Sequence, residues 1–206
     1  MARPALRTLV TAAGWTAVAA VAVESARRAR TDRVDTCEAR AFRWFNDRSD
    51  RIAVPAWAVM QSGSLGAVFA TAGLVARRRD LRAAVPVALV GTTAWVGAKV
   101  VKPLVGRGRP EEYLTHVFVR GRRQSGLGYP SGHAVVALTL ALAVPPVLGL
   151  ERRSSLGLAA VGTAVATGAA RMYVGAHLPL DVVGGFALGL GGGRMASAIF
   201  ERVGVT

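Results

Sequence analysis

The sequence predicts an all-α integral membrane protein, a bundle of six transmembrane helices in one domain over residues 1–206. Hydrophobic residues make up 52% of the chain, and the mean hydropathy is positive at +0.37. Six stretches each approach the roughly 20 apolar residues that a membrane-spanning helix needs. These observations together favour one compact domain that lies mostly in lipid.

The six expected spans are separated by short, arginine-rich connectors. They are Leu6–Val23, Ala53–Ala76, Ala83–Val101, Ala134–Leu150, Ser155–Ala170 and Leu178–Phe200. In a chain with six spans, the first, third and fifth connectors lie on the same side of the membrane. Connector three, residues 102–133, and connector five, residues 171–177, are therefore expected to meet, and they carry the unusual polar residues of the sequence.

The first apolar stretch follows a short basic segment, so it is either a cleaved signal peptide or a retained span. We expect retention because its length is near the spanning range and because its removal would leave an odd number of spans. The connector Glu24–Asp50 is expected to form a helix at the membrane interface, with Trp44 and Phe45 toward the acyl chains. A solvated charged helix that links two spans is the alternative.

The formal charge of +14 does not indicate nucleic-acid binding, because basic residues are scattered through every connector without a recognised reading module. The same scatter prevents the positive-inside rule from giving an orientation. Cys37 is the single cysteine, which excludes an internal disulfide, and we expect it on a helix face. The glycines at 185, 189 and 193 are expected to let helices pack closely inside the bundle, and the oligomeric state is left open.

Three cations in the two connectors form a candidate phosphate site. Lys102, Arg109 and Arg171 are each typical of residues that bind lipid headgroups. Together they fit a phosphoryl group better, since two guanidinium groups can pair with phosphate oxygens while an ammonium adds a point charge.

The turn Pro130–Gly132 is expected to begin a helix at His133. Ser131 would offer its hydroxyl, the helix N-terminus would favour an anion, and Gly132 would let the backbone approach it. An ordinary helix cap is the alternative for Ser131 and Gly132. His133 directly precedes an apolar run, where a polar side chain costs free energy unless it has a partner or a task.

His177 and Asp181 are four residues apart, so they lie on one face of the helix that Pro179 helps to begin. The carboxylate would hold one imidazole nitrogen protonated and leave the other as a nucleophile or base. His133 would then donate a proton to the departing oxygen. A purely structural His–Asp pair is the alternative. His116 is interpreted as a surface residue, and the absence of a metal-ligand cluster in the sequence predicts chemistry without a metal.

These residues form three ordered motifs in a core over residues 102–181: Lys102-x6-Arg109-Pro110, then Pro130 to His133, then Arg171-x5-His177-x3-Asp181. They resemble the three signature motifs of the type 2 phosphatidic acid phosphatase (PAP2) superfamily, in its membrane lipid phosphatase branch. The resemblance implies a phosphatase of lipid phosphates or polyprenyl diphosphates that needs no metal or other cofactor. Its implied partners are the lipid phosphate substrate and membrane lipids, not nucleic acid.

The resemblance also assigns roles to the motif residues. It implies a phosphohistidine at His177, a proton donor at His133 and an orienting carboxylate at Asp181. The implied phosphate contacts are Lys102, Arg109, Ser131, Gly132 and Arg171. A multi-pass protein of the cell membrane with its site on the extracytoplasmic face is implied as well.

One position departs from the family pattern. The third motif usually opens with Ser-Arg, and here it is Ala170-Arg171, so one hydroxyl is missing. Two alternative functions therefore accompany the phosphatase. One is a phosphotransferase that uses a lipid phosphate donor, and the other is a non-catalytic membrane protein that binds an anionic lipid.

Overall fold

A computed structural model of the chain describes residues 2–31 and 33–205, with the backbone alone for residues 2–11. Every regular element in this part of the chain is a helix, which confirms the all-α prediction. Residues 1, 32 and 206 of the predicted domain lie outside the described residues. In chain order the helices are α1 (Ala2–Ala29), α2 (Thr36–Asn46), η1 (Asp50–Ile52), α3 (Ala53–Met60), η2 (Gln61–Gly63), α4 (Leu65–Arg78), α5 (Leu81–Val105), α6 (Pro110–Tyr113), α7 (Gly132–Val147), α8 (Ser155–Tyr173) and α9 (Pro179–Arg202).

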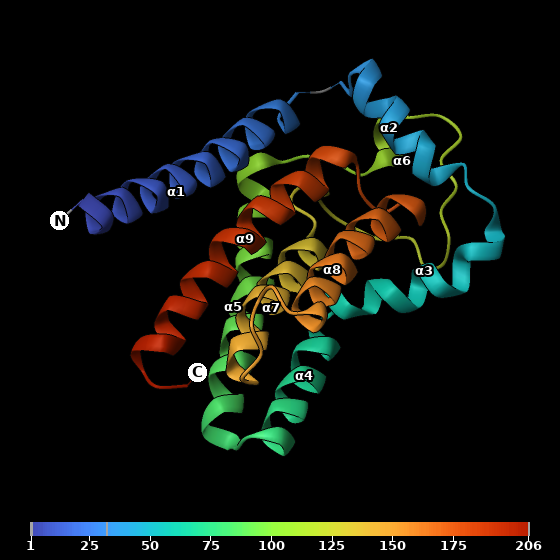
Figure 1. Ribbon diagram of the computed structural model, residues 1–206. Coiled ribbons are helices and arrows are strands. Elements are labelled where there is room, and N and C mark those ends of the chain that lie inside the picture. The colour runs from blue at the N-terminus through green and yellow to red at the C-terminus, as the bar shows by residue number, and fades with distance from the viewer. Residues whose placement is uncertain (1, 32, 206) are drawn as a thin grey trace.

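Helix α7 is the centre of the bundle. It is buried along almost its whole length and packs against α5, α8 and α9. The apolar core on one of its sides joins Val136 and Val147 to side chains of α4, α5 and α9. Helix α4 lies beside α5, and α1 leans away from the bundle while it contacts α9 (Figure 1).

The structure supports a membrane protein, and the number of six spans stays a prediction. Among the described residues, two helical stretches are long and apolar enough to cross a membrane, Leu81–Tyr113 and Pro179–Arg202. The pair of segments Asp50–Gly63 and Leu65–Arg78 makes a third if it is counted as one span. Helix α7 is apolar but has 16 residues, so it is shorter than an ordinary span.

The predicted span Ala53–Ala76 is not one straight helix. The chain bends by 67° between Gly63 and Leu65, after the 3-10 turn η2. Ser64 ends the first segment and begins the second, because its Oγ accepts the N–H of Ala67 at 3.1 Å and so caps α4. Hydropathy does not reveal this break, since apolar residues continue on both sides of the polar turn.

The bend brings Gly63 against the start of α7. A Cβ at Gly63 would collide with the carbonyl group of His133. The 3-10 turn is therefore packed on the backbone that carries His133, and glycine is required there by the close approach. Next to it, the hydroxyl oxygens of Ser62 and Thr167 lie 2.7 Å apart and tie the turn to α8.

The connector Glu24–Asp50 is not one interfacial helix. Its first residues continue α1 to Ala29, and only Thr36–Asn46 form α2, which Asp35 caps through the N–H of Glu38. Trp44 is 61% exposed, whereas Glu38, Phe42 and Asn46 are buried. One face of α2 is thus packed on the protein with two polar residues in it, which neither sequence interpretation anticipated. Cys37 is exposed on the same helix, as expected.

The glycines of α9 pack inside the bundle, which confirms that prediction. A Cβ at Gly185 would lie 2.7 Å from the carbonyl oxygen of Ser131, and one at Gly189 would lie 2.8 Å from that of Val135. These contacts are tighter than real Cβ atoms make. Small residues therefore set the close packing of α9 on α7.

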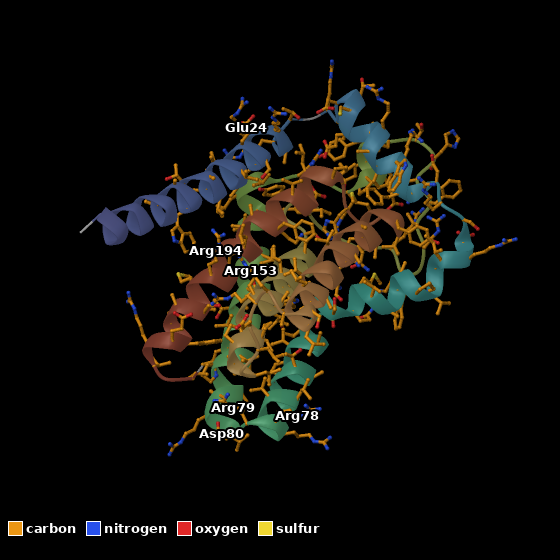
Figure 2. All side chains as sticks on the ribbon, in the orientation of Figure 1. Glu24, Arg78, Arg79, Asp80, Arg153 and Arg194 are labelled. Carbon is orange, nitrogen blue, oxygen red and sulfur yellow. The ribbon has the colours of Figure 1, made fainter. Side chains whose placement is uncertain are left out.

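The third and fifth connectors meet at one end of the bundle, as predicted. The N–H of Arg120 donates to the carbonyl oxygen of Val174 at 3.1 Å. Gly175 has φ of +76°, and a Cβ there would lie 2.6 Å from the carbonyl oxygen of Phe118, so only glycine allows this approach. At the opposite end, Arg78, Arg79 and Asp80 form the charged tip of the α4–α5 hairpin (Figure 2).

We predict that Gly63→Ala destabilises the protein and lowers its activity. The added methyl group meets backbone that cannot move independently of His133, and overpacking of this kind costs about 1–3 kcal/mol. The midpoint of thermal unfolding in detergent measures the effect. Gly73→Ala is the control, because nothing lies within 4 Å of a Cβ at that exposed helix position. Equal midpoints for the two variants would contradict the prediction.

Candidate active site

A cavity of about 220 Å³ opens at the end of the bundle where the two connectors meet. One part of its wall is apolar and includes Trp57 and Met60 of α3. The other part includes the guanidinium groups of Arg109 and Arg171, the imidazole of His133 and the carboxylate of Glu111. The structure thus brings together three of the predicted site residues, from the third connector, α7 and α8.

Arg171 is a buried cation without a carboxylate partner in the described part of the chain. It lies in the last turn of α8 and is 3% exposed. Its Nη1 contacts Sδ of Met60 at 3.4 Å, and its Nε has no hydrogen-bond partner among the described residues. A buried guanidinium with unused donors is costly unless a ligand completes its hydrogen bonds. An anion in the cavity would supply such acceptors.

Arg109 connects the cavity with His177. Its Nη1 donates to the carbonyl oxygen of Ala176 at 2.7 Å and lies 3.1 Å from Nε2 of His177. Its Nε donates to the carbonyl oxygen of Gly126 at 2.9 Å, which fixes the guanidinium from the other side. No carboxylate lies within ion-pair distance of Arg109 among the described residues. Its charge is therefore available to an anion beside His177.

His177 and Asp181 are in contact, as predicted, but His177 precedes Leu178, the N-cap of α9, and therefore does not lie on one helix face with Asp181. Nδ1 of His177 lies 3.3 Å from Oδ2 of Asp181, and both side chains are buried. The same Oδ2 accepts the N–H of Leu178 at 3.0 Å, so Asp181 also caps α9. We assign the proton to Nδ1, because Asp181 accepts it and because Arg109 donates toward Nε2. The lone pair of Nε2 then points toward Arg109.

The electrostatic surroundings keep His177 neutral. Burial lowers the pKa of its imidazole well below the usual range, and the positive charges of Arg171 and Arg109 lower it further. Since the folded-state pKa lies below that of the unfolded chain, protonation on acidification opposes folding. At neutral pH the ring is uncharged, which is the form that a nucleophilic or basic nitrogen requires.

The first turn of α7 carries Ser131, Gly132 and His133. The backbone N–H of Ser131 donates to the backbone oxygen of Asp181 at 2.9 Å, which joins the second and third motifs. The Oγ of Ser131 is buried, makes no cap hydrogen bond and has no other partner among the described residues. The alternative of an ordinary cap by the Ser131 side chain is therefore wrong. A Cβ at Gly132 would make only an ordinary contact with Ala98, so the protein itself does not require glycine there.

Lys102 does not line the cavity, although it was predicted to contact the phosphate. Its Nζ donates to the carbonyl oxygens of Leu127, Gly128 and Pro130 at 2.7, 3.0 and 3.1 Å. These three bonds use all three hydrogens of the ammonium group. In this structure Lys102 holds the loop that leads into α7, and it is not among the described residues that line the cavity.

Two residues of the site were not singled out by sequence reasoning, Glu38 and Arg107. The guanidinium of Arg107 pairs with both carboxylate oxygens of Glu38, at 3.0 and 2.7 Å, and its Nη1 lies 3.3 Å from Oδ1 of Asp181. Arg107 lies two residues before Arg109 within the first motif, and this position could have identified it as a site residue. Glu38 lies on α2, far from the three motifs in sequence, and no sequence pattern identified it.

His116 and Ala170, the two other positions discussed from the sequence, lie outside the cationic part of the cavity. His116 is exposed, as expected for a surface residue. Ala170 packs in an apolar cluster with Met60 and Tyr173, so the position of the missing hydroxyl adjoins apolar side chains. Within residues 2–31 and 33–205, no three His, Cys, Asp or Glu side chains gather where they could hold a metal ion.

The chain combines an all-helical fold, a cavity lined by cations and a buried His–Asp pair, and sequence comparison identifies its family. Residues 81–204 match the family model described as the PAP2 superfamily, and this match covers more than half of the chain. The chain belongs to the PAP2 superfamily.

Two curated relatives are similar over part of their length. The lipid A 4'-phosphatase of Bacteroides thetaiotaomicron is 36% identical over 108 residues, which is 50% of this chain and 47% of that protein. The undecaprenyl-diphosphatase of Sulfolobus acidocaldarius is 30% identical over 119 residues, or 58% and 56% of the two chains. The chain thus spans about half the length of the curated relatives it matches.

Two crystal structures share the fold. One is a transmembrane PAP2-type phosphatidylglycerolphosphate phosphatase from Bacillus subtilis, with a TM-score of 0.71, 21% identity, and coverage of 92% of this chain and 96% of that one. The other is LpxE of Aquifex aeolicus, with a TM-score of 0.65, 24% identity, and coverage of 76% and 92%. At these identities the likeness establishes the architecture.

We predict that Lys102→Met loosens the loop before α7 even when no substrate is bound. The change leaves three carbonyl oxygens without their donor, so the amides of residues 127–129 should exchange hydrogen faster. Mass spectrometry of the exchanged protein measures this. Lys99→Met is the matched control, because the other lysine of the chain places its ammonium over the Trp95 ring instead. Unchanged exchange in Lys102→Met would contradict the prediction.

Proposed function

We propose that this protein is a membrane lipid phosphatase that hydrolyses the terminal phosphate of a lipid phosphate or a polyprenyl diphosphate. The observation that carries the proposal is the pair of buried guanidinium groups, Arg109 and Arg171, which face one cavity with His133 and lack carboxylate partners in the described residues. A phosphoryl group supplies the missing negative charge and the hydrogen-bond acceptors. The names of the two curated relatives support this substrate class.

In the first step, Nη1 of Arg109 turns from Nε2 of His177 to a phosphoryl oxygen of the substrate, which frees the Nε2 lone pair. Nε2 then attacks phosphorus, and the bond from phosphorus to the lipid oxygen breaks. His133 donates a proton to the departing oxygen, so the lipid leaves as an alcohol or, from a diphosphate, as the lipid monophosphate. Asp181 keeps the Nδ1 proton in place and stabilises the positive charge that the ring gains. Arg109 and Arg171 stabilise the charge on the phosphoryl oxygens as it moves.

In the second step, a water molecule attacks the phosphohistidine. His133, now neutral, accepts a proton from this water, the bond from phosphorus to Nε2 breaks, and inorganic phosphate leaves. The hydroxyl of Ser131, at the N-cap of α7, has no partner in the part of the chain that the structure describes, and it is a further hydrogen-bond donor to the phosphoryl oxygens. Gly132 would offer its backbone N–H beside it. Lys102 acts through the loop that it holds and, after a shift of that loop, through its charge.

We propose the same membrane arrangement that the sequence predicts. The six spans are then α1, the bent pair α3–α4, α5, α7, α8 and α9. The cavity lies on the extracytoplasmic side of the cell membrane. The apolar wall near Trp57 and Met60 then faces the lipid from which the substrate comes. The lipid tail remains in the membrane while the phosphate enters the cationic part of the cavity.

We predict that His177→Asn abolishes phosphate release from lipid substrates. The asparagine side chain has no nucleophilic nitrogen, so turnover should fall by about 10³-fold or more. Purified protein in detergent is tested with lipid monophosphates and polyprenyl diphosphates, in parallel assays with and without a chelator, because the proposed chemistry uses no metal. His116→Asn is the matched control, and it should retain the activity of the unmodified protein.

Each of four outcomes would contradict part of the proposal. Unchanged turnover in His177→Asn would exclude His177 as the nucleophile, and loss of activity with the chelator would exclude the metal-free reaction. Phosphoryl transfer that occurs only after an alcohol acceptor is added would indicate the phosphotransferase. Folded protein that binds the lipid phosphates but releases no phosphate would indicate the non-catalytic lipid-binding protein.

A further inference from the structure

We infer that Glu38 of α2 is a positioning residue for the reaction. It fixes Arg107, and Arg107 in turn fixes the His177–Asp181 pair. This inference rests on the proposed function. It assigns a function to α2, which lies outside the three motifs and outside the residues matched by the family model.

The contacts form one continuous chain from α2 to the imidazole. Arg107 donates to both oxygens of Glu38 and lies 3.3 Å from Oδ1 of Asp181. The other oxygen of Asp181 lies 3.3 Å from Nδ1 of His177. A displacement of Glu38 therefore changes where Arg107 holds Asp181, and Asp181 sets the orientation of the imidazole ring.

Glu38 also contacts the start of α9 directly. Its Oε1 accepts the backbone N–H of Leu180 at 2.9 Å, next to the position where Asp181 caps the same helix through Leu178. Two carboxylates are thus placed at the N-terminus of α9, which favours negative charge. The segment that carries both His177 and Asp181 is consequently attached to α2 by a charged residue.

The burial of this chain of contacts argues against a purely structural ion pair. The side chains of Glu38, Arg107 and Asp181 are 5%, 1% and 0% exposed. A buried ion pair is often no more stabilising than apolar residues of similar volume, so stability alone does not explain why three charges are buried together. A requirement for a fixed geometry at His177 does explain it.

The charge of Glu38 acts on His177 together with its other neighbours. The titratable or charged groups that act on the imidazole are Asp181 of α9, Arg171 of α8, His133 of α7, Lys102 of α5 and Arg109 of the third connector, and Arg107 lies behind Asp181. Glu38 lies behind Arg107 and balances its charge. Loss of the Glu38 charge leaves Arg107 to act on Asp181 alone, which makes the surroundings of His177 more positive.

The test is Glu38→Gln, which keeps the side-chain shape and removes the charge. We expect kcat to fall by about 10-fold, as for other residues that orient a catalytic group, with KM changed less than about twofold. The acid limb of the pH profile of kcat/KM should move to lower pH, because a more positive environment favours the neutral imidazole. Asp35→Asn is the matched control: it removes the same charge three residues earlier, at the exposed N-cap of α2, and asparagine still caps the helix.

A second measurement does not depend on turnover. The Nδ1–H proton resonance of His177, observed in protein labelled at histidine, reports its hydrogen bond with Asp181. It should move in Glu38→Gln and stay in place in Asp35→Asn. An unmoved resonance and an unmoved acid limb in folded Glu38→Gln would overturn the inference. An unmodified protein that releases no phosphate would overturn the proposed function, while the resonance would still decide the positioning role.

Discussion

The burial of three guanidinium groups at one end of the helix bundle is the constraint on which the site depends. Arg107 is compensated by Glu38 and Asp181, whereas Arg109 and Arg171 have no carboxylate partner among the described residues. An uncompensated buried charge costs on the order of several kcal/mol even after the protein relaxes. The fold maintains this excess positive charge, and an anionic ligand in the cavity would offset it. Anion binding and the stability of this end of the bundle are therefore linked.

The remaining structure keeps these cations and the two histidines in place. Glycines in α9 let it pack closely on α7, and the bend before α4 presses Gly63 onto the backbone of His133. Asn46 of α2 is fully buried and donates to backbone oxygens of Phe118 and Tyr173. Both connectors at the cavity are thus fixed by packing or by hydrogen bonds to backbone, which keeps Arg109 and Arg171 at the cavity before a phosphoryl group binds.

Sequence reasoning succeeded where the contacts are local or follow from helix periodicity. His177 and Asp181 are four residues apart and in contact at the start of α9, although His177 lies before the helix, and the order of spans brings the two connectors to one end. It failed where partners are far apart in sequence. The pair Glu38–Arg107 joins residues 69 positions apart, and the loop carbonyls that Lys102 binds follow it by 25 to 28 positions. The bend at Ser64 was missed because hydropathy measures composition and not the direction of the chain.

The central claim is that His177 is the nucleophile, and trapping the phosphorylated protein tests it most directly. Folded protein is mixed with a lipid phosphate that carries a radiolabelled terminal phosphate, quenched within one turnover and digested for mass spectrometry. The account predicts a label that is stable in alkali, labile in acid and located on His177. Complete turnover with no labelled protein, or a label on Ser131 or another residue, would contradict it.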